Sequence, residues 1–286
     1  MRAGREAKSP PSPAQPHGAG RWPRRILVAY VALVLLFLIA PILAIVPLSF
    51  NGGSFLTYPL DGLSLRWYAE VLTTEKWLRA LTNSVIIAVP ATALATILGT
   101  LAAVGLSHSR LRGKAVITGL LISPMIVPVI ITAVGMYFFF APLGLVNSYS
   151  GLILAHAALG APFVFITVSA TLSTFDNSLI RAAASLGAPP LTAFFRVTMP
   201  LIAPGLISGG LFAFATSFDE VIVVLFIGGP GQRTLPREIF DGIREHVTPA
   251  ITAVATLLIL FATALMATME ALRRRNERLA GQRKEP

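Results

Sequence analysis

The chain contains no cysteine in 286 residues, and only 13% of the residues are charged. Without cysteine there is no disulfide, no thiolate nucleophile and no cysteine-ligated metal. The four histidines are too scattered for their spacing to predict a metal site; they are His17, His108, His156 and His246. A composition that is 55% hydrophobic is too apolar for an ordinary soluble domain, so it predicts an integral membrane protein.

A nucleotide-binding phosphate loop is also missing. Such a loop has the pattern Gly-x4-Gly-Lys-Ser/Thr. Here Gly113 and Lys114 are followed by Ala115, and His108 stands where the first glycine is needed. No serine or acid lies in a recognisable nucleophile motif. We therefore expect no catalytic residues, no ATP hydrolysis by this chain alone, and a protein that is not an enzyme.

The formal net charge is +10, which raises the question of a nucleic-acid partner. The cations gather beside apolar segments, a pattern typical of membrane topology signals and not of a phosphate-binding face, so nucleic acid is not expected. Residues 1–22 are rich in Pro, Gly, Ala and Arg, which predicts a disordered basic tail. Residues 273–286 form a second basic tail.

Apolar segments of membrane-spanning length recur along the chain. The first, 26–48, follows Arg24 and Arg25 and, at about 23 residues, is longer than the apolar core of a cleavable signal. The others are 82–106, 116–140, 151–171, 201–227 and 249–270. The expected fold class is an all-α integral membrane protein with six transmembrane helices. Pro124 and Pro128 are expected to bend the third of them.

The loops and termini differ in charge from one side to the other. Clusters of excess cations lie in both tails and in the loops 107–115 and 172–200, whereas the loops 50–81 and 228–248 carry balanced charge. Because cytoplasmic segments are enriched in Lys and Arg, both termini and the 172–200 loop are predicted to face the cytoplasm. The balanced loops also contain amphipathic pieces, which predict short helices with either a gating role or no ligand contact.

Small residues recur at intervals of four within two spans. They are Ala88, Thr92, Thr96 and Thr100 in the second span, and Gly205 and Gly209 in the fifth. Such stripes favour close helix packing, with a hydrophilic pathway as the alternative. His156, in the fourth span, is interpreted in the same way as a packed, hydrogen-bonded side chain instead of a ligand.

Two acids lie inside the fifth predicted span, in the sequence Thr216-Ser217-Phe218-Asp219-Glu220. A carboxylate near the bilayer centre costs about 2.5–3.5 kcal/mol on insertion scales, so these side chains must face a cavity or a partner. We expect Asp219 and Glu220, with Thr216 and Ser217, to line a passage that attracts a cation. A structural pair buried at a subunit interface is the alternative.

A moderately polar stretch, Arg181 to Pro200, separates the fourth and fifth predicted spans. Its apolar residues recur at helical spacing up to Gly187, and Pro189 and Pro190 restart the chain before Phe194 and Phe195. This predicts a hairpin of two short helices. A hairpin exposed at the end of a membrane bundle is suited to docking a partner.

This hairpin resembles the inner-loop signature of importer-type ABC transporter permeases, Glu-Ala-Ala-x3-Gly-x6-Phe-x2-Ile-x-Leu-Pro. The identities are Ala182, Ala183, Gly187, Phe194 and Pro200, while Val197 and Met199 replace Ile and Leu. Arg181 stands where the family has Glu. Three further segments are similar to the second permease subunit of the spermidine/putrescine branch, so that the resemblance covers about 60–272; they are Ser64 to Tyr68, Ser217 to Val221 and Arg233 to Arg237.

The resemblance implies a type I importer in a bacterial inner (plasma) membrane. Its expected partners are a second permease subunit, a dimer of cytoplasmic ABC ATPases that use ATP and Mg, an extracytoplasmic solute-binding protein and the lipid bilayer, with no cofactor bound by this chain. The transmembrane domain would occupy 61–272, after a segment 23–60 that holds the first helix. The coupling residues implied are Arg181, Ala182, Ala183, Gly187, Phe194, Phe195 and Pro200.

Three alternatives remain open from the residues themselves. An ion-coupled secondary transporter could use Asp219 and Glu220 as a proton relay and would need no ATPase. An importer permease for another small solute would keep the hairpin and change the passage. A polytopic scaffold without transport leaves the intramembrane acids unexplained.

Overall fold

The computed structural model describes residues 21–109, 111–173, 176, 178–245 and 247–282. Over these residues the chain is helical, and its only extended pairing is an isolated bridge between Asn51 and Leu63. The chain divides into two compact units, Met1–Pro47 and Leu48–Pro286. The described part has five helices long and apolar enough to cross a membrane, or six if one bent pair counts as a single span. The fold class predicted from the sequence is therefore confirmed.

The first unit consists of α1, Arg21–Leu48, of which Arg25–Leu48 is apolar enough to cross a membrane. This confirms the first predicted span. Most of the predicted disordered tail 1–22 lies outside the described residues, and its last two residues begin α1.

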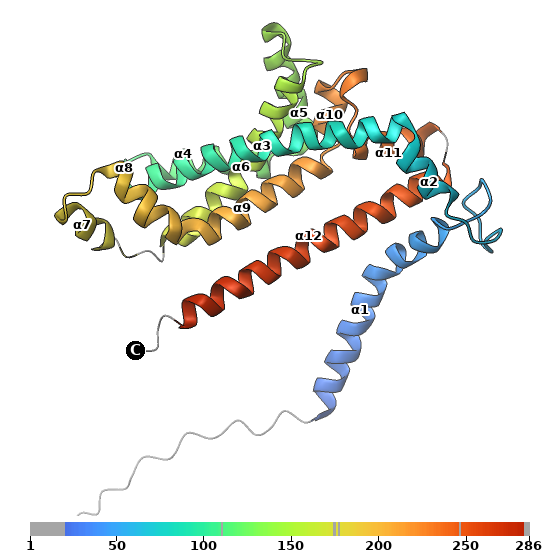
Figure 1. Ribbon diagram of the computed structural model, residues 1–286, viewed down its shortest axis with the longest axis horizontal. Helices are drawn as coiled ribbons and strands as arrows, with labels where there is room; N and C mark the ends of the chain where they lie inside the picture. Colours follow the sequence, from blue (N-terminus) through green and yellow to red (C-terminus); the bar gives the residue numbers. More distant parts are fainter. Residues whose placement is uncertain (1–20, 110, 174–175, 177, 246, 283–286) are drawn as a thin grey trace, which may run out of the picture. The chain divides into compact units, whose positions relative to one another are not determined.

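Three long helices form the centre of the second unit: α3 (Glu75–His108), α6 (Tyr149–Ser173) and α9 (Met199–Asp219). They run side by side in Figure 1. Small residues let their backbones approach: a methyl group added at Gly160 would lie 3.0 Å from Ala213 on α9 and 3.2 Å from Ala95 on α3. The packing interpretation of the two small-residue stripes is confirmed, because Ala88 is fully buried and Gly209 packs against Val164.

The third predicted span is broken. α4 (Lys114–Ile126) and α5 (Val129–Phe140) differ in direction by 107°. Pro128 begins the second piece without a backbone N–H, and Val127 caps the first with an extended backbone. The expected bend is thus confirmed; α5 continues into η1, Ala141–Leu143.

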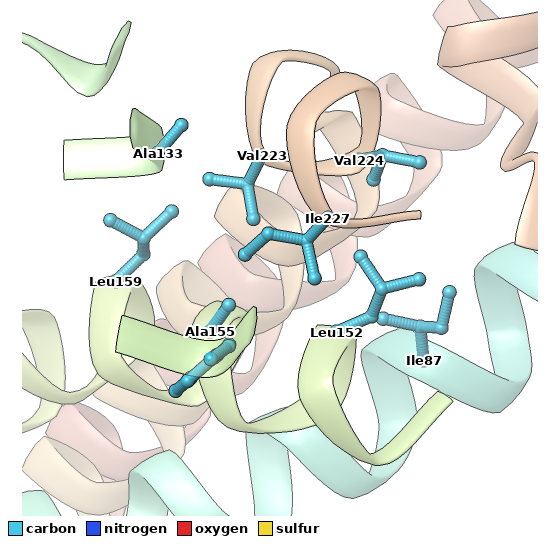
Figure 2. Packing of buried hydrophobic residues seen from close by; sticks show 9 residues of the cluster. Ile87, Ala133, Leu152, Ala155, Leu159, Val223, Val224 and Ile227 are labelled. Carbon is cyan, nitrogen blue, oxygen red and sulfur yellow. The ribbon is translucent and has the colours of Figure 1, made fainter. Parts of the chain in front are cut away.

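A buried apolar cluster fixes the end of this bent pair to the rest of the unit. Figure 2 shows Val223, Val224 and Ile227 of the short helix α10 (Ile222–Ile227) packed against Leu152 of α6 and Ile87 of α3. Val223, Val224 and Ile227 are fully buried, so close packing anchors α10 even though it has only six residues.

Several further helices gather at the end of the unit opposite α7, Ser178–Ser185 (Figure 1). They are α2 (Arg66–Thr73), η3 (Pro230–Gln232), α11 (Leu235–Glu245) and the start of α12 (Pro249–Gln282). Trp67 and Trp77 are buried there among Leu235 and Val254. The two amphipathic pieces predicted from the sequence are therefore the short helices α2 and α11.

Candidate functional site

The fifth predicted span is not continuous, which corrects the expectation of one helix over 201–227. α9 ends at Asp219, Glu220 has an extended backbone, and the chain restarts as α10. The physical reason lies in the side chain of Glu220, whose Oε1 accepts a hydrogen bond of 3.0 Å from the backbone N–H of Val223. This carboxylate caps the new helix, and capping competes with continuing the old one.

The other end of α10 is also held by polar contacts. Arg237 of α11 donates from Nη1 to the carbonyl oxygens of Val224 and Gly228, each at 2.9 Å. The backbone N–H of Asn147 donates to Ile227 O at 2.7 Å. Burial lowers the pKa of the Arg237 guanidinium. The break is therefore a built feature, with both ends of α10 satisfied by named partners.

Asp219 lies at this break with its side chain exposed, next to a cavity of about 620 Å³. The cavity is bounded by α9, α11 and α12, and Thr216, Asp219 and Glu220 all line it. An exposed carboxylate among apolar helices satisfies the sequence expectation that the acid faces a cavity or a partner. Three of the four predicted passage residues are thus brought together.

Ser217, the fourth, points elsewhere. Its side chain is buried, and its hydroxyl lies 2.8 Å from Nδ1 of His156, which also lies 3.1 Å from Ser217 O. His156 is only 1% exposed. This confirms His156 as a packed, hydrogen-bonded side chain, and it ties α6 to the last turn of α9 directly before Asp219.

The first half of the predicted hairpin is α7, Ser178–Ser185. Asp176 accepts hydrogen bonds from the hydroxyl (2.5 Å) and backbone N–H (2.8 Å) of Ser178, and these bonds lower the pKa of Asp176. Gly187 ends the helix with a left-handed backbone, φ 79°, and Ala188 N donates to Ala183 O. The predicted first helix and its glycine stop are confirmed.

The second half of the hairpin is not a separate helix, which corrects the sequence expectation. α8 (Pro190–Ala193), a π-helical turn η2 (Phe194–Thr198) and α9 follow one another without interruption, so the chain is helical from Pro190 to Asp219. Pro200 lies within this continuous helix and has no backbone N–H to donate, and the π-helical turn η2 ends two residues before it.

The hairpin exposes several large apolar side chains. Leu186 is 89% exposed and Phe195 58%, and Leu191 is exposed as well, whereas Phe194 is half-buried and stacks edge to face on Phe195 at 5.1 Å. The remaining predicted coupling residues are distributed over the same surface: Arg181, Ala182, Gly187 and Pro200 are exposed, and Ala183 is half-buried. A group of exposed apolar side chains is typical of a surface that contacts another protein or a membrane.

Sequence reasoning missed the capping role of Glu220 and the reach of Arg237 to α10. The β-branched residues that follow Glu220 have low helix propensity, but Ile222 to Val224 are helical in α10, so they do not mark the position of the break. Sequence reasoning also missed the phenylalanines that line the cavity. Phe214 and Phe218 share a helix face by their spacing of four, but their neighbour Phe261 comes from α12.

Together, the bundle of apolar helices, the exposed intramembrane acid and the exposed hairpin define a multi-pass membrane transport subunit. The family model for the binding-protein-dependent transport system inner membrane component matches residues 95–279, and the chain belongs to that family. That family is the one that the hairpin signature indicated.

Curated relatives extend the match to most of the chain. The chain is 34% identical over 248 residues to the spermidine/putrescine transport system permease protein PotC of Haemophilus influenzae, covering 87% of this chain and 96% of that one. It is 37% identical over 246 residues to the putrescine transport system permease protein PotI of Escherichia coli strain K12, covering 84% and 86%. A molybdenum transport system permease protein, ModB of Mycobacterium bovis, is 31% identical over 237 residues, with 76% and 89% covered.

A solved structure has the same fold. It is a bacterial ABC transporter involved in the import of the acidic polysaccharide alginate, which matches with a TM-score of 0.73 and 16% identity and covers 91% of this chain and 99% of its own.

Proposed function

We propose that this chain forms half of the membrane pathway of an ATP-driven importer for a small cationic solute, a polyamine such as spermidine or putrescine. The observation that carries the proposal is the carboxylate of Asp219, which is exposed beside a cavity in the membrane-spanning bundle. A protonated amine is the partner that such a carboxylate favours in a poorly hydrated passage. The relatives named for spermidine and putrescine transport support this choice of substrate.

The proposal includes the partners of an ABC importer. A second permease subunit completes the pathway, a dimer of ATPases binds ATP and Mg, and a solute-binding protein delivers the substrate, while this chain binds no cofactor and hydrolyses no ATP. Both termini and α7 face the cytoplasm, because the cation-rich segments lie on that side. The transport domain extends over 61–272, and the protein lies in the bacterial inner membrane.

The mechanical part of the proposal links α7 to the break at Glu220. The exposed apolar tip around Leu186 and Phe195 lies in a cleft of the ATPase, in the manner of a helix in a groove. Closure of the ATPase dimer then moves the continuous helix from Pro190 to Asp219 as a lever. Its far end carries Asp219, so ATP-driven motion displaces the carboxylate that holds the cation.

ATP dependence of uptake is the first prediction. In proteoliposomes that hold the full complex, with the solute-binding protein outside, we expect polyamine uptake only when ATP is enclosed inside, on the side that α7 faces. A protonophore should leave this uptake unchanged. Uptake driven by an imposed proton gradient without ATP would assign the chain to the ion-coupled transporters instead.

Charge reversal at the hairpin is the second prediction. Arg181 is exposed on α7, at the position where the inner-loop signature that the hairpin resembles has Glu, so we propose an acidic partner on the ATPase. Arg181→Glu should then weaken co-purification of the ATPase by about tenfold, because two like charges would face each other. Arg112→Glu is the matched control, an exposed arginine in a different loop that should have little effect. Unchanged assembly and ATP turnover in the Arg181 variant would contradict the acidic partner.

A further inference from the structure

The cavity beside Asp219 is lined by apolar side chains as well as by the two acids. Its lining is mostly apolar and comes from three helices. The side chains that line it are Phe214, Ala215, Thr216, Phe218, Asp219, Glu220, Pro236, Leu258, Ile259, Phe261, Ala262 and Leu265. A volume of about 620 Å³ lies within the range of small-molecule sites.

Three phenylalanines make part of this lining aromatic. Phe214 and Phe218 lie one turn apart on α9 with ring centroids 5.5 Å apart and a small angle between the rings. Phe261 of α12 lies 5.2 Å from Phe218 and 6.3 Å from Phe214. Phe218 is buried behind its neighbours, whereas Phe261 remains 43% exposed. The most accessible ring of the cluster therefore lines the same cavity as the carboxylate of Asp219.

The combination of a carboxylate and aromatic rings is selective for organic cations. A ring face attracts an ammonium group through its quadrupole, and a methylene chain packs favourably on the same face. An anion is repelled by the carboxylate, and a neutral sugar gains no charge attraction from it or from the ring quadrupole. A strongly hydrated metal cation needs ligand atoms to replace its bound water. Among the described residues, no cluster of three or more His, Asp and Glu side chains offers such ligands.

We infer that Phe214, Phe218 and Phe261 form, with Asp219, a subsite for one alkylammonium end of the transported solute. This inference rests on the proposed function and adds to it a second recognition element. Asp219 supplies the charge, and the ring of Phe261 supplies the attraction that separates an organic amine from other cations.

Stepwise fluorination of the ring at position 261 tests this role. Fluorine withdraws charge from the ring face with little change in size, so it weakens cation–π attraction and leaves packing nearly intact. In the full complex in proteoliposomes, trifluorophenylalanine at position 261 should lower putrescine uptake about fivefold, with monofluorinated rings intermediate. Phe261→Tyr, which keeps the ring, should retain most of the uptake, and Phe261→Leu should lose it.

Phe212 provides the matched control. It lies on α9, is 48% exposed, stacks with Phe163 and does not line the cavity. The same fluorination there should leave uptake unchanged. Equal effects at Phe212 and Phe261 would overturn the subsite.

The remaining outcomes separate the two proposals. A trifluorinated ring at position 261 that transports at the wild-type rate overturns the subsite while the importer function stands. If the Phe261→Leu complex loses the second permease subunit on purification, the subsite is overturned as well, because the three phenylalanines then form a subunit interface. Wild-type complex that takes up no polyamine under ATP overturns both the proposed function and the subsite.

Discussion

Asp219→Asn is expected to lower ATP-driven polyamine uptake by about tenfold or more, with the complex still assembled. The amide keeps the shape of the side chain and removes its charge, and a hydrogen bond to a charged group is worth about 1.5–3 kcal/mol. Because Asp219 is exposed beside the cavity and accepts no capping hydrogen bond like that of Glu220, the substitution leaves no helix end unsatisfied. Initial uptake rates of labelled putrescine and spermidine measure the effect.

Glu220→Gln is the matched control for this variant. Glu220 lines the same cavity, but its Oε1 is engaged by Val223 N–H, and the glutamine oxygen can accept that bond too. Uptake should therefore fall much less than in Asp219→Asn. Wild-type uptake in the Asp219 variant would make the acid a packing residue and would remove the local support for a cationic substrate. A larger loss of uptake in Glu220→Gln than in Asp219→Asn would mean that the charge of the capping residue Glu220 attracts the cation.

The sequence was sufficient for the parts of the fold that depend on local pattern. Apolar length located the spans, Gly187 located the end of α7, and Pro128 located the bend of the third span. Helix boundaries set by tertiary packing were harder to predict. α3 begins at Glu75, well before the predicted 82, because Trp77 and Ala80 pack into a cluster with α2, α11 and α12.

The site was predictable in its charge and not in its geometry. An acid within an apolar run indicates a cavity on energetic grounds alone, which is why Asp219 was identified. The sequence does not show that the Glu220 side chain caps α10 or that Ser217 contacts His156. Both contacts depend on where the helix breaks. Phe261 joins Phe214 and Phe218 only after α12 packs on α9, and a single sequence contains no signal for that pairing.

A strongly destabilising substitution is expected at Gly209, where α9 lies against α6. A methyl group there would lie 2.7 Å from Cα of Val164, a backbone atom that cannot rotate away. Overpacking of this kind costs about 1–3 kcal/mol for a small group and more for a large one, so Gly209→Ala should lower the melting temperature by several degrees. Gly209→Leu has no room at all and should abolish recovery of folded complex from detergent extracts.

Gly105→Ala tests whether the loss comes from contact and not from the removal of glycine. Gly105 lies within α3 with open space around the added methyl group, and alanine has the higher helix propensity, so its melting temperature should be unchanged or slightly raised. If Gly209→Leu assembles and melts like the wild type, α6 and α9 cannot be in the close contact described here. The contact at Gly209 and the hydrogen bond between His156 and Ser217 both hold α9 beside α6. Without the contact at Gly209, the proposed lever from the hairpin to Asp219 would lose part of this support.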